Sequence, residues 1–493
     1  MSQLLEMQTL VKTLESENRY LREQLALLKK ALFGPRSEKI QSDHPQLPFL
    51  GMEEVHEPEE VVVADDEGAR PKRERRKTPH GRKPLPAHLP RERVEHHPPK
   101  EDCTCKCGDA MKPCGEDITE ELEYIPASFR VKEHARIRYA CRRCQEKPVQ
   151  LAALPRPIEK GRPGPGLIAH VLTSKYADHI PLNRQSQIMA REGVDIARST
   201  LCDWVADGYD RLGPLLRGLK HSILQSRVVG NDDTKIIMQL NHRGGGRKTC
   251  YLWSSTGDRK EVYFDFTTGR GREGPTKFFG NYQGTIVVDG YGGYNELFSK
   301  KGVREAGCWA HARRYFVDAM RSDPDKGSWV VSEISELYGI EKKIRELRAE
   351  EKVAIRETES EPILAGLFEK LEAWKIDALP KSAWGKAVNY ALNRKEALLV
   401  FARDGEVPID NNATERTIRN IAVGRKNWLF TGSVDGGKRA AGIYSLIGTC
   451  KLQGIDPWEY LCDVLERAPH LKDEVLAKLI PRLWKEERKA GCD

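Results

Sequence analysis

Apolar residues near the start of the chain recur every seven positions in two interleaved series. The members are Leu4, Val11, Asn18, Leu25 and Leu32 in one series, and Met7, Leu14, Leu21 and Leu28 in the other. This spacing is the a and d pattern of a coiled coil, and Asn18 at an a position favours the defined register of a parallel dimer. We predict a coiled-coil helix over residues 1–33 that joins two or more copies of the chain. A single amphipathic helix packed on its own chain is the alternative.

The hydrophobic pattern stops at residues 34–100, where charge and proline dominate. An acidic run, EEVHEPEEVVVADDE, is followed by a basic run with eight Lys or Arg between Arg70 and Lys83. Such a segment buries too little apolar surface to fold alone, so we predict a disordered charged linker. The basic run has enough charge to neutralise several phosphates. Simple solvation, or pairing with the nearby acids, explains it equally well.

Helical periodicity begins again in residues 165–222. The pattern predicts a helix, a turn at Gly193, and a second helix that Ser199 caps. This arrangement is similar to a DNA-binding helix-turn-helix, but many connections in all-α proteins have the same pattern.

Residues 223–325 have the pattern of strands. Three apolar stretches rich in β-branched and aromatic residues, separated by glycine-rich turns, predict an antiparallel meander: RVVGNDDTKIIMQL, KTCYLWSSTG and EVYFDFTTG. A short helix, a buried strand (GTIVVDG), a further strand (REAGCWA) and a helix (HARRYF) follow. The order β-β-β-α-β-α-β-α matches a ribonuclease-H-like fold, with a mixed sheet covered by helices.

This strand order brings two acids together. Asp232 lies in the first predicted strand and Asp289 ends the fourth, and these strands are neighbours in the expected sheet. Two carboxylates about 4 Å apart repel by roughly 4 kcal/mol at an effective dielectric constant near 20. A divalent cation removes this repulsion, and hard oxygen ligands suit Mg²⁺ or Mn²⁺. We therefore predict a metal site that needs a third carboxylate from elsewhere in the chain.

Glu415 is the candidate for the third carboxylate. The spacing of Asn412 and Glu415 also fits a capping box, and Glu415 and Arg419 fit an i,i+4 ion pair, so a surface helix explains Glu415 as well. Asp410 is the rival acid, and its position favours an N-terminal cap.

Basic and aromatic residues near these acids are candidates for contacts with a phosphate backbone. The basic set is His311, Arg313, Arg314, Arg416, Arg419, Arg425 and Lys426. His311 is either a proton-transfer group or a hydrogen-bonded structural residue. Trp428 and Phe430 either stack on an unpaired base or pack in the core, and packing is the more common case.

The twelve cysteines are clustered, with six of them between Cys103 and Cys144. A CxxC pair and a nearby group of thiols indicate a structural zinc site in a small ribbon over residues 101–155. Four of five thiols suffice for that site: Cys103, Cys105, Cys107, Cys141 and Cys144. Isolated thiols or a redox pair are the alternatives. We interpret Cys308 and Cys450 as small buried hydrophobic residues.

Composition sets broad limits on the protein class. The chain has 493 residues, a formal net charge of +8 and 31% charged residues, which permits a polyanionic partner and requires several domains. No apolar run reaches the ~18 residues needed to span a bilayer, and no signal peptide is evident. We expect a cytoplasmic, nucleoid-associated protein without a membrane partner.

Several motifs resemble the insertion sequence 66 family of bacterial DDE transposases. The resemblance runs from about residue 20 to 465 and includes LFGPRSEK, CRRC, NDDTK, VVDGYGGYNEL, GCWAHARRYF, IDNNATERTIRNIAVGRKNWLFTGS and GIYSLIGTCKLQGIDPWEYL. It implies a ribonuclease-H-like core whose catalytic acids correspond to Asp232, Asp289 and Glu415. It also implies an N-terminal coiled coil, a zinc-binding segment and a C-terminal element. The family usually has Asp-Glu-Thr where this chain has Asp232-Asp233-Thr234, and the upstream zinc half departs from a plain CxxC.

The distance between the second and third acids, 415 − 289 = 126 positions, exceeds what a simple core of this kind needs. Helical periodicity over residues 326–400 predicts an all-α insertion there. It either supports the active site, contacts transposon ends or is inert packing. Residues 401–450 then complete the core, and residues 451–493 form a small helical element.

The resemblance favours a DNA transposase that binds the terminal inverted repeats of its element. Such an enzyme uses Mg²⁺ or Mn²⁺ to cleave DNA and transfer strands to target DNA. It acts as a homodimer or higher homo-oligomer, with accessory proteins as further possible partners. Two other functions fit the same features. One is a catalytically inactive, dimeric, zinc-containing DNA-binding protein, and the other is a ribonuclease-H-like nuclease.

Overall fold

The computed structural model describes residues 129, 131, 156–158, 163–240 and 245–490. The predicted coiled coil, the charged linker and the cysteine cluster lie outside the described residues, so the structure does not test them. All helices and strands described below belong to one compact unit of the chain.

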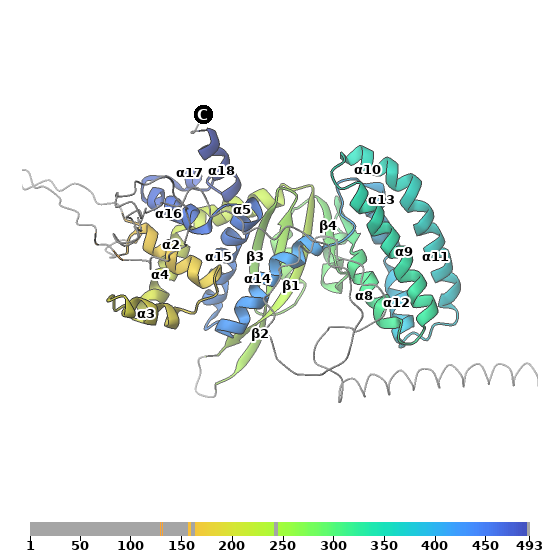
Figure 1. Ribbon diagram of the computed structural model, residues 1–493, viewed down its shortest axis with the longest axis horizontal. Helices are drawn as coiled ribbons and strands as arrows, with labels where there is room; N and C mark the ends of the chain where they lie inside the picture. Colours follow the sequence, from red (N-terminus) through yellow and green to blue (C-terminus); the bar gives the residue numbers. More distant parts are fainter. Residues whose placement is uncertain (1–128, 130, 132–155, 159–162, 241–244, 491–493) are drawn as a thin grey trace, which may run out of the picture. The chain divides into compact units, whose positions relative to one another are not determined.

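A mixed five-stranded sheet in the order β3-β2-β1-β4-β5 forms the centre of this unit (Figure 1). Its first three strands are antiparallel, whereas β4 and β5 run parallel to β1. The bounds are β1 Val228–Gln239, β2 Arg247–Gly257, β3 Glu261–Thr267, β4 Gly284–Val288 and β5 Val303–Gly307. This confirms the ribonuclease-H-like core that the sequence predicted.

Strand β4 shows why the sheet is covered on both faces. Its side chains alternate between two apolar clusters: Val287 packs with residues of α8 and the insertion, while Ile286 and Val288 pack with Phe278 and Phe279 of α6. A strand buried on both faces has a continuous apolar sequence, as β4 does. The helical elements between β3 and the insertion are α6 Glu273–Phe279, the 3₁₀ turn Gly292–Tyr294, α7 Asn295–Phe298 and α8 Trp309–Ala319.

Within the described part of the chain, four helices precede the sheet: α2 Pro165–Tyr176, α3 Leu182–Arg191, α4 Arg198–Arg211 and α5 Gly213–Leu224. The predicted turn is present between α3 and α4, with Gly193 at a φ of +83° that a side chain would disfavour. The predicted cap is wrong. Helix α4 begins at Arg198 after Ala197, so Ser199 lies within the first turn, and no side chain caps this end.

The predicted all-α insertion is confirmed between α8 and α14. It consists of α9 Pro324–Lys343, α10 Ala349–Ile355, a π-helical turn Arg356–Ser360, α11 Glu361–Lys375, α12 Ala383–Asn393 and α13 Lys395–Arg403. Its core is continuous with β4, β5 and α8. The buried guanidinium of Arg356 pairs with Glu341 at 2.7 Å and donates to the carbonyl oxygens of Phe401 and Asp404. A buried charge needs such saturation with partners.

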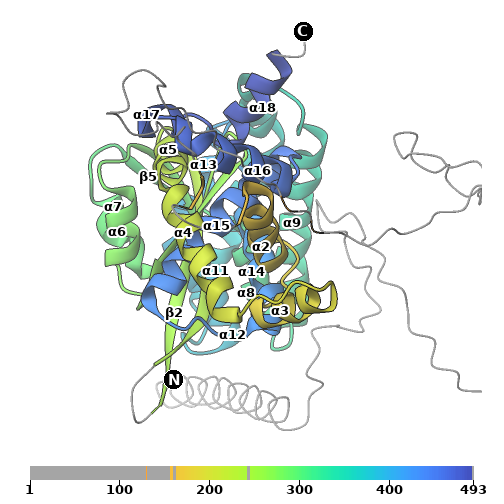
Figure 2. The same ribbon diagram turned by 90° about the vertical axis from the view of Figure 1, so that its left-hand side faces the viewer.

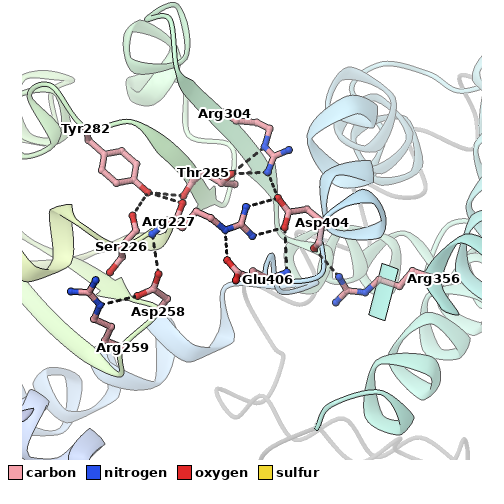
Figure 3. A network of polar contacts seen from close by, with 10 residues as sticks. All are labelled: Ser226, Arg227, Asp258, Arg259, Tyr282, Thr285, Arg304, Arg356, Asp404 and Glu406. Atoms are coloured by element: carbon pink, nitrogen blue, oxygen red, sulfur yellow. Dashed lines mark hydrogen bonds and ion pairs between the residues drawn. The ribbon is translucent and has the colours of Figure 1, made fainter. Parts of the chain in front are cut away.

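The insertion returns to the sheet at Asp404, whose carboxylate accepts hydrogen bonds from two arginines at the start of the parallel strands (Figure 3). Arg227 precedes β1 and reaches Asp404 at 2.6 and 3.0 Å, and Arg304 lies in β5 and also donates to Thr285 of β4. These bonds lower the pKa of Asp404 well below its usual range, with the hydrogen bond from Arg227 as the largest cause.

The chain ends in a second group of helices: α14 Asn412–Trp428, α15 Val434–Gln453, α16 Pro457–Arg467, a 3₁₀ turn Ala468–His470, α17 Asp473–Leu476 and α18 Pro481–Ala490. Helix α16 packs against α2, beside which it lies in both views (Figures 1 and 2). The expected division after residue 450 falls inside α15. Among the described residues, no helix has both the length and the apolar character needed to span a bilayer.

Helix α15 protects the outer edge of the sheet. Strand β3 is an edge strand, and the N–H groups of Val262 and Phe264 donate to the hydroxyls of Thr449 and Ser445 at 3.1 and 2.8 Å. An edge strand with free N–H groups invites pairing with another chain. Two polar residues on an otherwise apolar helix face therefore satisfy that edge.

Candidate active site

The parallel pairing of β1 and β4 brings Asp232 and Asp289 to the same end of the sheet. Gly230 is paired with Val287, and two residues further along each chain are Asp232 and Asp289. Asp289 follows the last residue of β4, where the chain leaves the sheet. Two acids from distant parts of the sequence therefore become neighbours because of strand order alone.

Helix α14 brings Glu415 to these acids, because its start packs closely on β1. A Cβ atom at Gly230 would lie 2.2 Å from the hydroxyl of Thr414 and 2.5 Å from the side-chain oxygen of Asn411, so only glycine permits this approach. The Asn411 amide donates to the carbonyl oxygen of Asn231 at 2.9 Å. Glu415, in the first turn of α14, is thereby directed to the end of β1.

The pKa of Asp232 reports the proximity of the three acids. Burial raises this pKa, the carboxylates of Asp289 and Glu415 raise it further, and the result is about 7. The backbone N–H of Asp233 donates to Asp232 at 2.8 Å and offsets part of the effect. The Oε1 atom of Glu415 is buried without a hydrogen-bond partner among the described residues. The three acids influence one another electrostatically, but among the described residues their ligand atoms do not all lie within 4.8 Å of one another, as those of Cys308, His311 and Glu415 do. A divalent cation bound between the three carboxylates would relieve their repulsion.

The neighbouring acid Asp233 has a partner of its own. Arg270, in the loop after β3, donates to its carboxylate at 2.8 Å and stacks on the ring of Tyr291 at 4.2 Å. Successive residues of a strand point to opposite faces. Asp232 therefore faces the other acids while Asp233 faces Arg270. No sequence signal identifies Arg270, because a lone arginine in a glycine-rich loop has no recognisable pattern.

The loop that carries Asp289 is held by the insertion. The hydroxyl of Tyr390 donates to the backbone oxygen of Asp289 at 2.8 Å, and Arg394 donates to the carbonyl oxygen of Gly290 and pairs with Glu305. Gly290 has a φ of +90°, and a Cβ atom there would lie 2.2 Å from Arg394. Tyr390 and Arg394 have no recognisable sequence signal, because their contacts join residues about a hundred positions apart.

Helix α8 contributes the partners of Glu415. The Nδ1 atom of His311 lies 3.6 Å from Oε1 of Glu415, and Arg314 lies 3.7 Å from Oε2. Burial lowers the pKa of His311, although the Glu415 carboxylate opposes this shift. Among the described residues no ion pair joins Glu415 to Arg419, so that expected pair is absent.

Cys308 lies beneath the same group. Cys308 and Cys450 are both fully buried, as expected for small hydrophobic residues. The potential ligand atoms of Cys308, His311 and Glu415 lie within 4.8 Å of one another. Burial raises the pKa of Cys308 to about 12, so the thiol stays protonated and accepts the N–H of Asn411 at 3.2 Å. It supports the start of α14 and is a poor ligand for a hard cation.

The rival acid Asp410 points to the insertion. Its carboxylate accepts the hydroxyl of Tyr338 at 2.8 Å and both the backbone and the side-chain N–H groups of Asn412. The predicted capping box is wrong: α14 begins at Asn412, and no side chain caps its N-terminus from the preceding Asn411. The acceptor at this end is Asp410, which binds the first N–H of the helix.

The remaining basic candidates divide into two groups. Arg313 and Arg416 lie on the insertion side. Burial raises the pKa of Tyr338 and that of Asp410, and the charges of Arg313 and Arg416 partly oppose these two shifts. Arg419, Arg425 and Lys426 follow α14 away from the acids, and the Arg425 guanidinium donates to the carbonyl oxygen of Lys235 on β1. Of the two aromatic candidates, Trp428 packs against the core, whereas Phe430 is 42% exposed, so core packing is wrong for Phe430.

Comparison with known proteins agrees with this architecture. The family model described as "Transposase IS66 family" matches residues 160–439, which cover the sheet, the insertion and α14. The chain belongs to the IS66 transposase family. Further models of this family match the flanking segments. "Transposase C of IS166 homeodomain" matches residues 20–94, "zinc-finger binding domain of transposase IS66" residues 102–145, and "IS66 C-terminal element" residues 445–481.

Relatives of this IS66 family member occur in Sinorhizobium fredii (strain NBRC 101917 / NGR234). The uncharacterized protein y4jD is 34% identical over 95% of each chain. The uncharacterized protein y4hP is 35% identical over 93% of this chain and 87% of its own length, and y4qI is 33% identical over 90% and 84%. The similarity therefore extends over nearly the whole IS66 transposase chain, and the zinc-finger match supports the zinc-binding segment that the cysteines predicted.

Proposed function

We propose that this IS66 transposase cleaves DNA at the ends of its insertion sequence and joins the freed 3′ ends to target DNA, with Asp232, Asp289 and Glu415 as its catalytic acids. The observation that carries the proposal is the meeting of three carboxylates from β1, β4 and α14, with the pKa of Asp232 raised to about 7. Neighbouring acids at the end of a buried sheet reduce the stability of a fold, and carboxylates with perturbed pKa values gather at functional sites.

The three acids have the donor chemistry that Mg²⁺ or Mn²⁺ binds, and their ligand atoms would have to move closer together than in this structure to share one ion. They supply hard oxygen ligands, their mutual repulsion disappears when a cation binds, and Oε1 of Glu415 has an open hydrogen-bonding capacity. When bound, divalent ions polarise the scissile phosphate and favour an attacking oxygen in its deprotonated form. Water first displaces the 3′ oxygen at the element end, and the freed 3′-hydroxyl then displaces a 3′ oxygen in target DNA.

Residues around the acids orient Glu415 and the DNA. His311, with its lowered pKa, and Arg314 flank the Glu415 carboxylate, and Arg314 is exposed enough to reach a phosphate as well. Arg416, Arg419 and Lys426 are exposed on α14, where a DNA backbone would pass. We assign recognition of the terminal repeats to the zinc-finger segment, with four of its five candidate cysteines binding Zn²⁺, and pairing of protomers to the heptad helix.

A strand-transfer assay on labelled element ends with Mg²⁺ or Mn²⁺ tests this proposal. Glu415→Gln keeps the shape of the side chain and removes its charge, and we expect strand transfer to fall by about 10²–10³-fold. Asp410→Asn is the matched control, because Asp410 already binds Tyr338 and Asn412. The reverse result, with Asp410→Asn inactive and Glu415→Gln active, would identify a different third acid. Binding without cleavage by the wild-type protein in either metal would indicate an inactive DNA-binding relative.

A further inference from the structure

Helix α14 ends in an unusual turn at Leu429. The residue has φ +61° and ψ −43°, and the N–H of Phe430 donates to the carbonyl oxygen of Trp428 at 2.7 Å. This geometry is close to a classic γ-turn, which is rare and strained, and a positive φ is most unfavourable for a bulky side chain. Glycine would adopt it without strain. The chain nevertheless keeps a leucine at the apex, and that leucine is 63% exposed.

The Leu429 turn, residues 428–431, is fixed at both ends. Trp428 packs against the core cluster that contains α15 and the N-terminal helices. On the other side Thr431 joins the end of β1: its N–H donates to the carbonyl oxygen of Ile237 at 2.8 Å, and its own carbonyl oxygen accepts the N–H of Gln239 at 2.9 Å. The exposed leucine is therefore held in a defined position. Strain that the surrounding structure maintains is a sign of function.

Apolar side chains surround this apex. Phe430 is 42% exposed, and Val423 on α14 and Val434 at the start of α15 are also exposed. Val423, Lys426 and Asn427 follow the i, i+3, i+4 spacing that places residues on one side of α14, and Phe430 follows the turn that ends this helix. The turn thus presents a small apolar ridge to solvent.

The ridge lies among basic residues. The described segments 235–240, 245–250 and 423–439 meet here, and they contain one acid, Asp435. Their basic residues are Lys235, Arg247, Lys248, Arg425, Lys426, Lys438 and Arg439. An apolar surface for a protein partner is usually depleted in charge at its centre. A basic surround favours a polyanion, and apolar side chains that enter duplex DNA unstack its bases while basic residues bind the backbone.

Two elements set the distance from the acids to this ridge. Along β1, six residues separate Asp232 from Met238, which is about 20 Å at ~3.3 Å per residue. Along α14, thirteen residues separate Glu415 from Trp428, which is also about 20 Å at ~1.5 Å per residue. Helix α14 and strand β1 pack side by side (Figure 1). Helix α14 also contacts the next strand, because the hydroxyls of Ser254 on β2 and Thr417 on α14 are joined by a hydrogen bond of 2.8 Å. At ~3.4 Å per base pair, the interval corresponds to about six base pairs of duplex DNA.

We propose that Leu429 and Phe430 form an apolar wedge that inserts between base pairs of DNA about six base pairs from the phosphodiester held at the acids. This inference rests on the proposed function, because it requires DNA at Asp232, Asp289 and Glu415. The wedge unstacks one base step, and Lys426 and the basic ends of β1 and β2 hold the adjacent backbone. Its ligand is duplex DNA, with the bent or unstacked step as the recognised feature.

Fluorescence of the adenine analogue 2-aminopurine tests the wedge directly. The analogue is placed in turn at successive positions of a duplex that carries the terminal repeat. The full-length chain is added in buffer without Mg²⁺ or Mn²⁺, which prevents cleavage and, unlike a chelator, leaves Zn²⁺ in the zinc-finger segment. We expect a rise in fluorescence, which marks unstacking, centred about six base pairs from the cleavage site. Leu429→Gly should abolish the rise and weaken binding by about tenfold. Its thermal stability should be unchanged or higher, because glycine relieves the strained φ. Phe430→Ser is the second variant.

Ile376→Ser is the control, since Ile376 is 87% exposed on the insertion, far along the chain from the turn. It should bind and unstack DNA as the wild type does. A flat fluorescence profile with the wild-type protein, or an unchanged profile with both Leu429→Gly and Phe430→Ser, would overturn the wedge. So would loss of the oligomer in Leu429→Gly, which would assign the ridge to a protein contact. These outcomes leave strand transfer intact and are distinct from failure of the proposed function, in which the wild type neither cleaves nor joins DNA.

Discussion

Asp232 and Asp233 are adjacent on β1, yet they have opposite surroundings. Asp233 is saturated by Arg270, whereas Asp232 faces two further carboxylates and has a pKa of about 7. The sequence shows that adjacent residues of a strand point to opposite faces of the sheet. Which of the two acids points toward Asp289 depends on the register between β1 and β4. A sequence can therefore nominate the pair, and only the folded sheet distinguishes its members.

Substitution of these two acids should change stability to different extents. In protein without added Mg²⁺ or Mn²⁺, Asp232→Asn removes repulsion with Asp289 and Glu415, and we expect the Tm at about pH 8 to rise by roughly 2–4 °C. Burial raises the pKa of Asp233 as well, but the pair with Arg270 opposes that shift, so Asp233→Asn should raise the Tm less than Asp232→Asn does. Differential scanning calorimetry measures both. Added Mg²⁺ should raise the Tm of the wild type and leave Asp232→Asn nearly unaffected; an equal increase in both would show that Asp232 does not bind the metal.

Gly230 lets the start of α14 approach β1 because it has no side chain, and this approach positions Glu415. A methyl group there would collide with Thr414 and Asn411, so Gly230→Ala should displace the start of α14, which carries Glu415. We expect a loss of about 1–3 kcal/mol in the free energy of unfolding and a marked loss of strand transfer. Gly292→Ala is the matched control, because a Cβ atom there has no neighbour within 4 Å. Equal stability of both variants in urea would show that α14 accommodates the methyl group.

At the scale of elements, periodicity predicted much of the fold. The five strands, their order, the all-α insertion and the position of α14 follow from the spacing of apolar residues and from the acids at strand ends. Helix ends were less predictable. Ser199 and Asn412 have side chains that can cap a helix, but α4 begins at Arg198 and α14 begins at Asn412, so neither residue occupies the N-cap position.

The insertion should act on the site through α12. Tyr390→Phe removes only the hydroxyl that holds the Asp289 backbone and keeps the ring stacked on Tyr315. With a bond worth about 1 kcal/mol lost, we expect the Mg²⁺ concentration for half-maximal strand transfer to rise about fivefold. Lys395→Ala, which removes a surface pair with Glu372, should leave it unchanged. A change in total activity without a change in Mg²⁺ dependence would mean that Tyr390 does not position Asp289.

Across the whole described unit, the contacts that join its parts are long-range polar bonds that no local pattern reveals. Asp404 ends the insertion and binds arginines at the start of β1 and in β5, 177 and 100 positions away in the sequence. Thr449 and Ser445 accept hydrogen bonds from the edge strand β3, although they lie on α15, more than 180 positions later in the sequence. A single Asp or Ser in the sequence does not reveal whether its side chain will face water or the edge of a strand. Such contacts emerge only when the elements are packed together.

The Asp404 junction makes the attachment of the insertion dependent on pH. The folded pKa of Asp404 is lowered, so its contribution to stability is present above the unfolded value of about 3.8 and is lost as pH falls below it. Asp404→Asn should cost about 1–2 kcal/mol at neutral pH, a moderate value because Arg227 is half exposed. Urea unfolding at a series of pH values measures this cost. The difference between wild type and Asp404→Asn should begin to shrink below about pH 4, where the unfolded chain takes up the proton, and should vanish only once pH falls through the lowered folded pKa of Asp404. A difference that stays constant with pH would assign the cost to lost packing, and the insertion would then be held to the sheet by its apolar core alone.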